Sequence, residues 1–286
     1  MCSERFGRED TTTSQRIEMI KQALIGLTAA ALLAGCGGED KAQAPAAKAA
    51  DGTKTVGLVQ LVEHPALDAA SRGIQDAVKA RGLKVTFDVQ NAQADQSNLA
   101  NIAQRFVSQE YPLIFAVATP AAQTMANAAK NTPIVATAVT DYEAAKLVIN
   151  KDKPGTNVTG SSDLNPIGAQ LDLIMQFVPN AKTIGTIYNS SEINSQFQVE
   201  ILKKELARYN VTLVEGTVSS VNDVQQVAQG LIGKIDALYV PTDNIIASAM
   251  PVLTKITTPA KVPVITGEEG PLHLSLIHIS EPTRPY

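Results

Sequence analysis

Two stretches of the sequence decide the fold. Leu113–Met125 reads LIFAVATPAAQTM, and Ala237–Met250 reads ALYVPTDNIIASAM. Each begins with a short apolar run, passes through Thr-Pro or Pro-Thr-Asp, and ends in a pattern typical of a helix. A Pro-led apolar run follows each stretch: TPIVATAV after the first and VPVITG after the second. A buried strand therefore leads into a helix and then into another strand, once in each half of the chain.

The same alternation extends to both sides of these stretches. In the first half we expect helices over residues 65–80, over 96–110 and from 120 onward. In the second half we expect helices over residues 166–178, 193–209, 221–232 and 244–257. Strands that alternate with helices predict parallel sheets with helices on both faces. The sequence therefore predicts an α/β protein with two Rossmann-like lobes, over residues 55–157 and 158–270. NVTGSS (Asn157 to Ser162) is the expected first crossing between them, and a single elongated α/β domain is the alternative.

The composition fits a soluble globular core. Of 286 residues, 44% are apolar and 18% are charged, and 24 basic against 28 acidic residues give a formal charge of −4. Because no Lys/Arg stripe appears, the sequence does not have the charge pattern of a nucleic-acid binder. Cys2 and Cys36 are the only cysteines. The folded body therefore lacks the thiols for thiol catalysis or a cysteine-based zinc site.

The N-terminus resembles a lipoprotein signal. Met19–Ala34 holds one basic residue near its start and then an uncharged apolar run, too short to span a bilayer. LLAGC, which ends at Cys36, resembles a lipobox, in which the cysteine is acylated; an ordinary signal peptide is the alternative. We expect residues 1–36 to be an over-extended start plus this signal. Residues 37–54, small and rich in Pro and Ala, are the expected flexible tether.

The C-terminus carries a different signal. Leu274–Pro285 reads LSLIHISEPTRP, which is the translation of a transposon-end sequencing adapter. We expect residues 271–286 to be a non-native tail. The second lobe is then expected to be incomplete, with its C-terminus truncated near Gly270.

Several short motifs, in order along the chain, resemble one known family, the ABC substrate-binding proteins of tryptophan/tyrosine type. The motifs are VEHPALDAA (from Val62), QNAQADQSN (from Gln90), ATPAAQ (from Ala118), AVTD (from Ala138), NVTG (from Asn157), VPTDN (from Val240) and GEEG (from Gly267). The resemblance covers most of residues 56–270. It implies a type I periplasmic-binding-protein fold that captures a small solute between its lobes.

The first-lobe motif Thr119-Pro120-Ala121-Ala122 follows a strand and opens a helix. We expect Thr119 to be the N-cap, with Pro120 in the first helical position. The N–H groups of Ala121 and Ala122 are then expected to bind a ligand carboxylate, aided by the helix dipole. The alternative is a well-capped helix without a ligand.

The second-lobe counterpart contains an acid. Asp243 is expected to accept a ligand ammonium, while Thr242 and Asn244 hydrogen-bond nearby. Alternatively, Asp243 is only a helix cap. Asp141 and Glu268, each at the end of a Pro-led strand, are weaker candidates for polar contacts of the same kind.

Two loops complete the candidate set. Glu63 and His64 lie between the first strand and helix, where His64 either bonds the ligand or fixes the turn. Asn189 begins a polar loop that serves equally well as a capping cluster. No second histidine or carboxylate lies at ligand spacing from His64, so we expect no metal site and no cofactor.

These features predict capture without chemistry. No GxSxG, HExxH or Walker A motif appears, so we expect no enzyme. The expected protein is a monomeric, lipid-anchored, extracytoplasmic solute-binding lipoprotein of an ABC importer. The donors at one helix start and the acid at the other are complementary to an amino acid, and the family resemblance implies an aromatic or apolar L-amino acid that is delivered to a membrane permease. We expect no nucleic acid to bind. The alternatives are a ligand-sensing lipoprotein for a receptor, or a binder of another small carboxylate or nucleoside-like solute.

Overall fold

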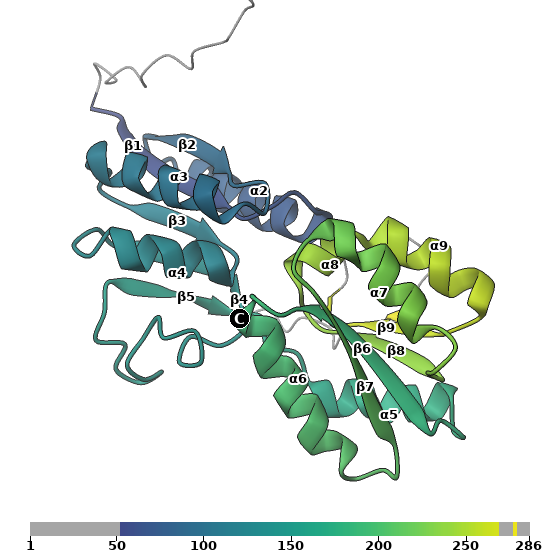
Figure 1. The fold of residues 1–286 in the computed structure, drawn as a ribbon. Helices are drawn as coiled ribbons and strands as arrows, with labels where there is room; N and C mark the ends of the chain where they lie inside the picture. The colour runs from purple at the N-terminus through teal and green to yellow at the C-terminus, as the bar shows by residue number, and fades with distance from the viewer. Residues whose placement is uncertain (1–51, 269–276, 279–286) are drawn as a thin grey trace, which may run out of the picture. The chain divides into compact units, whose positions relative to one another are not determined.

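The computed structural model describes residues 52–268 and 277–278, and it contains two five-stranded parallel sheets (Figure 1). The first sheet has the order β2-β1-β3-β4-β5. Its strands are β1 (Lys54–Gln60), β2 (Val85–Asn91), β3 (Ile114–Val117), β4 (Ile134–Val139) and β5 (Val158–Ser162). Its helices are α2 (Pro65–Ala80), α3 (Gln96–Ser108) and α4 (Thr119–Ala128). These elements form the first lobe.

The second sheet has the order β10-β9-β8-β6-β7. Its strands are β6 (Thr183–Asn189), β7 (Thr212–Val218), β8 (Ala237–Val240), β9 (Val264–Thr266) and β10 (Ile277–His278). Its helices are α5 (Ile167–Phe177), α6 (Ile193–Leu206), α7 (Val224–Leu231), α8 (Asn244–Ser248) and α9 (Met250–Ala260), with a short 3-10 turn, η1 (Val221–Asp223), before α7. The α/β class with two parallel sheets is confirmed.

The boundary between the lobes lies later than the sequence suggested. β5 pairs in parallel with β4, from Ile134 opposite Val158 to Val139 opposite Ser162. NVTGSS is therefore the edge strand of the first sheet rather than a crossing segment. The expected boundary at residue 157 is wrong, because the chain leaves the first sheet only after Ser162.

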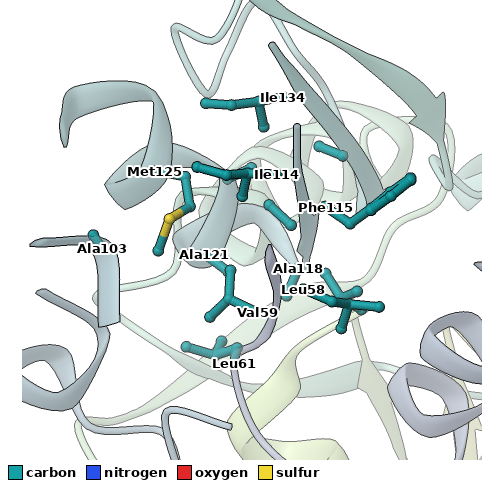
Figure 2. Close-up of a cluster of buried hydrophobic side chains, with 14 of the residues drawn as sticks. Leu58, Val59, Leu61, Ala103, Ile114, Phe115, Ala118, Ala121, Met125 and Ile134 are labelled. Carbon is teal, nitrogen blue, oxygen red and sulfur yellow. The ribbon is translucent and has the colours of Figure 1, made fainter. Parts of the chain in front are cut away.

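Strands buried on both faces form the core of the first lobe. Consecutive residues Leu58 and Val59 of β1 are both fully buried, as are Ile114 and Ala116 of β3. Figure 2 shows Leu58, Val59 and Ile114 gathered with Met125 of α4 in this cluster. Continuous apolar runs are typical of parallel strands covered by helices on both sides. This explains why the runs TVGLVQLVE and LIFAVA do not alternate with polar residues.

In the second lobe the two faces of the sheet can be told apart. Ala237 and Tyr239 of β8 pack in one cluster, with residues of α5 and α6. Leu238 and Val240 pack in another, with residues of α7, α8 and α9. Successive side chains of a strand point to opposite faces. The β8 strand is thus the middle strand of the sheet and lies between two layers of helices. Its carboxyl end leads into the loop Pro241–Asn244.

Two expected helices differ from the structure. The expected helix over 244–257 is divided at Ala249 into α8 and α9, and Pro251 lies in the first turn of α9. Proline lacks an N–H and disfavours helical backbone in the residue before it, so a helix restarts here. The expected helix over 221–232 begins as η1, where Asp223 and Ser220 form a capping box.

Some expectations fall outside the described residues. The signal, Cys36 and most of the tether precede residue 52, and most of the expected non-native tail follows residue 268. From that tail the structure describes β10, which pairs with β9 through Ile277 opposite Ile265. Within residues 52–268, the helices are all too short or too polar to span a bilayer.

Candidate functional site

The carboxyl ends of β1, β3 and β4 are neighbours in the first sheet and carry its candidate residues. His64 follows β1, Thr119 follows β3 and Asp141 follows β4. In open parallel sheets, ligands bind at this edge, where the strands end. The same edge of the second sheet holds the loops after β6, β8 and β9, which carry the second-lobe candidates.

The α4 helix begins without a side-chain cap. Its N-cap is Ala118, and Thr119 is the first helical residue, so the expectation that Thr119 is the N-cap is wrong. Ala118 has φ 90° and ψ 151°. A non-glycine residue in such a conformation stores about 1–3 kcal/mol of strain, and such strain is often found at functional sites. Figure 2 shows Ala118 and Ala121 in the core of the lobe, which holds this backbone in place.

This helix start retains hydrogen-bond donors without a protein partner. The Oγ1 atom of Thr119, a residue only 1% exposed, is buried without a hydrogen bond among the described residues. The N–H of Ala121 likewise has no acceptor in the part of the chain that the structure describes. Ala122 differs, because its N–H donates to Ala118 O at 3.0 Å. The expectation of a free N–H at Ala122 is therefore wrong, since the first intrahelical bond already ends there.

Asp243 caps α8 in the second lobe. Its Oδ1 accepts from the N–H of Ile246 at 2.9 Å. Its Oδ2 accepts from the N–H of Asn189 and from Ser195 Oγ, both at 2.6 Å. Asp243 is buried, and burial raises the pKa of its carboxyl. The capping role that the sequence left open is thus present, and it engages both carboxyl oxygens.

Glu192 is a second buried acid beside this cap, and the sequence reasoning missed it. Its Oε2 accepts from Asn244 Nδ2 at 2.5 Å and from Asn194 Nδ2 at 3.0 Å. Its Oε1 accepts from the N–H of Ile245 at 3.3 Å. Burial, followed by the nearby charge of Asp243, raises the pKa of Glu192 to about 8. The first turn of α8 therefore gives its N–H groups to two carboxyls.

Two further acids complete this group. Glu268 follows β9, and burial together with the charges of Asp163, Asp243 and Glu192 raises its pKa to about 8. Asp163 follows β5, and burial raises its pKa to about 6. Asp163 is partly exposed as a residue, but its Oδ1 is buried and has no hydrogen bond within residues 52–268. We call Asp163, Glu192, Asp243 and Glu268 the acidic quartet.

The four carboxyls of the quartet differ in how many hydrogen bonds their oxygens accept from the protein. Asp243 and Glu192 accept several protein donors each, whereas the side chain of Glu268 accepts none from the described residues. The charges that raise the pKa of Glu268 are all carboxylates. Buried acids of like charge disfavour one another's ionised form. A cation is the partner that this group lacks.

Thr242 and Asn189 belong to the framework of the site. The N–H of Thr242 donates to Gln198 Oε1 at 3.1 Å, and its carbonyl oxygen accepts from Asn194 Nδ2 at 3.0 Å. Its hydroxyl accepts from Asn165 Nδ2 at 3.0 Å, which leaves the hydroxyl proton and one lone pair for another partner. Asn189 uses its Oδ1 to accept from the N–H of Ser191 at 2.9 Å.

His64 and Asn244 join the two edges. His64 Nε2 lies 3.4 Å from Asn244 Oδ1. Because Asn244 Nδ2 donates to Glu192, its Oδ1 is the acceptor, and His64 Nε2 carries the hydrogen. Burial lowers the pKa of His64, which favours the neutral ring. The structure thus brings His64, Asn244 and Glu192 into one chain of polar contacts.

Two candidates lie apart from this arrangement. Asp141 accepts from the N–H of Glu143 at 3.0 Å, from the N–H of Ala144 at 2.8 Å and from Lys151 Nζ at 2.8 Å. Burial raises the pKa of Asp141, but these donors outweigh it and the net pKa is lowered. Glu63 is exposed. The oxygens of Asp141 thus accept protein donors, whereas no hydrogen bond of the Glu63 side chain is seen among the described residues; their expected ligand contacts stay predictions.

A signal for the two missed acids was present in the sequence. Glu192 is the only charged residue in the polar loop after β6, and Asp163 directly follows β5. Both satisfy the strand-end criterion that selected Asp243. Their burial is set by packing between distant segments, which a local pattern does not reveal.

Among the described residues, no group of three or more His, Cys, Asp or Glu has an arrangement suited to a metal ion.

Comparison with known families agrees with this geometry. The family described as ABC transporter substrate binding protein matches residues 55–272. The chain belongs to this family. The resemblance noted in the sequence is therefore confirmed. Substrate-binding proteins of ABC transporters work outside the cytoplasm and bind small solutes.

Three relatives narrow the comparison. A tyrosine-binding protein of Clostridioides difficile is 42% identical over 260 residues, which cover 88% of this chain and 75% of the relative. An ABC domain of Streptococcus pneumoniae in complex with L-Trp is 37% identical, with a TM-score of 0.76 and 78% of each chain covered. A conserved domain protein of Vibrio cholerae is 39% identical, with a TM-score of 0.77, covering 79% of this chain and 77% of that one. Two of these three relatives are named for, or were solved with, an aromatic amino acid.

The two-lobe, type I periplasmic-binding-protein fold is also confirmed. Leucine- and isoleucine-binding proteins share it at 16% and 17% identity, a likeness that extends to the fold alone.

Proposed function

We propose that this protein is an extracytoplasmic solute-binding lipoprotein of an ABC importer, and that it delivers an aromatic L-amino acid to a membrane permease. One observation carries the proposal: the start of α4 in the first lobe has hydrogen-bond donors without an acceptor among the described residues, and the strand-end edge of the second lobe carries Glu192, Asp243 and Glu268. The bond between His64 Nε2 and Asn244 Oδ1 joins these two edges. An α-amino acid is complementary to both, because it carries one anionic and one cationic group.

The carboxylate is assigned to the start of α4. Thr119 Oγ1 and the N–H of Ala121 lack acceptors within the described residues, and the N-terminus of a helix favours negative charge. The first turn of α4 contains no acidic residue that would compete for these donors. A carboxylate at this place would accept two hydrogen bonds from groups that the fold leaves free.

The ammonium is assigned to the acidic quartet, with Glu268 as its principal partner. The sequence favoured Asp243, but both oxygens of Asp243 already accept protein donors. Glu268 accepts none from the described residues, and the unpaired Oδ1 of Asp163 is a second acceptor. Glu268 is partly exposed as a residue. A desolvated carboxyl without donors is costly, and an ammonium with three N–H groups relieves that cost.

The relatives support an aromatic side chain. One is named for tyrosine, and another was solved with L-Trp. Capture needs no bond to form or break, so we propose that the protein is not an enzyme. The two lobes close around the solute, and contacts from both edges favour the closed form. We further propose that it acts as a monomer.

Calorimetric titration of the purified protein tests the ligand class. The panel consists of the twenty amino acids with sugars, purines and dicarboxylates as controls. We expect L-tyrosine, L-tryptophan or L-phenylalanine to bind, and the controls not to bind. Tight binding of a sugar or purine with no amino acid bound would contradict the zwitterion assignment.

Membrane fractionation tests the lipid anchor on Cys36, which lies outside the described residues. LLAGC at the end of an uncharged apolar run motivates this part of the proposal. When the chain is expressed in a bacterium, we expect it to partition into detergent, and we expect Cys36→Ser to fractionate as a soluble periplasmic protein. If both forms are soluble, the anchor is absent. Co-purification with a permease tests the importer assignment.

A further inference from the structure

The acidic quartet contains more carboxyls than one ammonium group needs. Asp163, Glu192, Asp243 and Glu268 meet at the carboxyl ends of strands β5, β6, β8 and β9. If all four were ionised in the empty protein, four negative charges would lie together in a poorly solvated place. Like charges that act on one another in a poorly solvated place disfavour joint ionisation. Something else must neutralise part of this charge before the ligand arrives.

Among residues 52–268, no cationic side chain neutralises this charge. The groups that act on Glu268 are Asp163, Asp243 and Glu192, and the one that acts on Glu192 is Asp243. His64 contacts Asn244 beside Glu192, but its buried ring favours the neutral form. No lysine or arginine of the described residues forms an ion pair with any member of the quartet.

We propose that the empty quartet holds at least one proton in place of a cation, and that the ammonium of the bound amino acid expels this proton. The inference rests on the proposed function and extends it. One positive charge enters as one leaves, so the net charge of the site is unchanged by binding. The carboxylic O–H gives its proton to solvent, and the carboxylate left behind accepts an N–H of the ammonium.

Hydrogen bonding indicates which carboxyl holds the proton. Asp243 and Glu192 each accept N–H donors from the first turn of α8, which stabilise their ionised forms. Glu268 accepts none among the described residues. A protonated Glu268 carries its own donor and so needs none. Burial and the neighbouring acids raise the pKa of Glu268 to about 8, as they do that of Glu192, so the hydrogen bonds and not the pKa values distinguish the two acids.

A second observation points to a donor-bearing ligand at the same place. Asn194 is 4% exposed, and its Oδ1 is buried without a partner within residues 52–268. Its Nδ2 donates to Glu192 Oε2 and to Thr242 O, which fixes the orientation of the amide. Together with Asp163 Oδ1, the site therefore contains two buried acceptors that an incoming N–H group would satisfy.

Calorimetry in two buffers tests the proton release directly. The full-length protein is titrated at pH 7 with L-tyrosine and with L-tryptophan, in phosphate and in Tris, whose ionisation enthalpies differ. We expect the observed enthalpies to differ by the difference between the two buffers' ionisation enthalpies multiplied by about 0.5–1, the number of protons released per ligand. We also expect Kd to fall roughly three- to tenfold per pH unit between pH 6 and pH 7.5, as linkage requires for this release. Burial lowers the pKa of His64, which favours its neutral ring as the pH rises through this range.

Variants locate the proton. In Glu268→Gln, which resembles the protonated acid, the released proton and the pH dependence of Kd should both diminish. Asp163→Asn should reduce them in the same direction, which keeps the test decisive if Glu268→Gln does not fold. Glu200→Gln, on the exposed face of α6, is the matched control and should behave as the unmodified protein.

Stability gives an independent check without ligand. A carboxyl whose pKa is higher in the folded than in the unfolded state binds more protons when folded, so stability falls as pH rises toward its folded pKa. We expect the melting temperature of the empty protein to fall between pH 5 and pH 8, and to fall less in Glu268→Gln. Ligand binding with equal enthalpies in both buffers would overturn the inference and leave the proposed function intact. Failure of every amino acid to bind would overturn both.

Discussion

The starts of α4 and α8 are built from similar sequences and have opposite chemistry. Each follows a buried strand, one through Ala118-Thr119-Pro120 and the other through Thr242-Asp243-Asn244. At α8, Asp243 caps the helix and the first N–H groups are consumed by carboxyls. At α4, the cap position is Ala118, which has no side-chain acceptor, so donors remain free. A single residue type at the cap decides whether a helix start serves the fold or can serve a ligand.

The largest expected effect is on the capped helix. Asp243→Ala removes the acceptor of three donors: Ile246 N–H, Asn189 N–H and Ser195 Oγ. Each buried donor left unsatisfied costs about 1–3 kcal/mol, and partial rearrangement reduces the sum, so we expect a loss of about 3 kcal/mol. Urea denaturation measures it. Asp243→Asn keeps one acceptor oxygen and should lose roughly half as much. An equal loss in both variants would argue against the capping role.

The second effect is on ligand affinity at the acidic edge. Glu268→Gln removes the carboxyl that has no protein donors, while Asp243 and Glu192 retain theirs. Leaving a buried charge without its partner costs about 2 kcal/mol or more. This corresponds to a loss of roughly thirtyfold in the Kd for L-tyrosine, at about 1.4 kcal/mol per tenfold. Because only the ionised acid binds the ammonium, the loss should be greater at pH 8 than at pH 6. An unchanged Kd would indicate that Asp243, and not Glu268, is the partner of the ammonium.

The third effect is on ligand affinity at the start of α4, which has no side-chain cap. Thr119→Val keeps the shape of the buried side chain and removes the hydroxyl that lacks a partner. A hydrogen bond to a charged group contributes about 1.5–3 kcal/mol, so Kd should rise about tenfold. Thr119→Ser restores the hydroxyl and should recover most of the affinity. Stability should change little, because the folded protein loses no bond; a marked fall in melting temperature would indicate a structural role instead.

The smallest effect concerns the backbone of the uncapped edge. Ala118 has φ 90°, a conformation that glycine adopts without strain. Ala118→Gly relieves about 1–3 kcal/mol of strain and loses about 0.4–1 kcal/mol through the freer unfolded chain. We expect a net gain of about 1 kcal/mol in the free energy of unfolding. Gly73, an exposed glycine of α2, offers a control: Gly73→Ala should also stabilise the protein, through helix propensity.

The sequence predicted most of the fold. Runs such as LIFAVA and ALYVP form β3 and β8 because continuous apolar residues suit a strand covered on both faces. The break between α8 and α9 was missed, although Pro251 signals it. The lobe boundary was misplaced because β5 is an edge strand with four exposed residues, and its pairing with β4 depends on residues distant in sequence.

The site was harder to predict than the fold. Thr119, Ala121, Asp243 and Glu268 were found because each lies at a strand end. An acid can bind a ligand cation only if its oxygens are not already accepting hydrogen bonds from the protein. Two donors to Asp243 lie on Asn189 and Ser195, some fifty residues away in the sequence. The position of a residue in the sequence predicts that it lies at the carboxyl edge of the sheet. Hydrogen-bond saturation, which separates Glu268 from Asp243, requires the packed structure.

We propose that the two edges bind the two charges of one zwitterion, and two ligand analogues that each lack one charge separate these contributions. Tyramine lacks the carboxylate of tyrosine, and 3-(4-hydroxyphenyl)propionate lacks its ammonium. Calorimetry should show that Thr119→Val weakens L-tyrosine about tenfold but changes the Kd of tyramine less than twofold. Glu268→Gln should weaken L-tyrosine about thirtyfold and leave 3-(4-hydroxyphenyl)propionate unaffected or bound more tightly. If each variant instead weakened both analogues alike, the charges would not be divided between the edges, and the account would be contradicted.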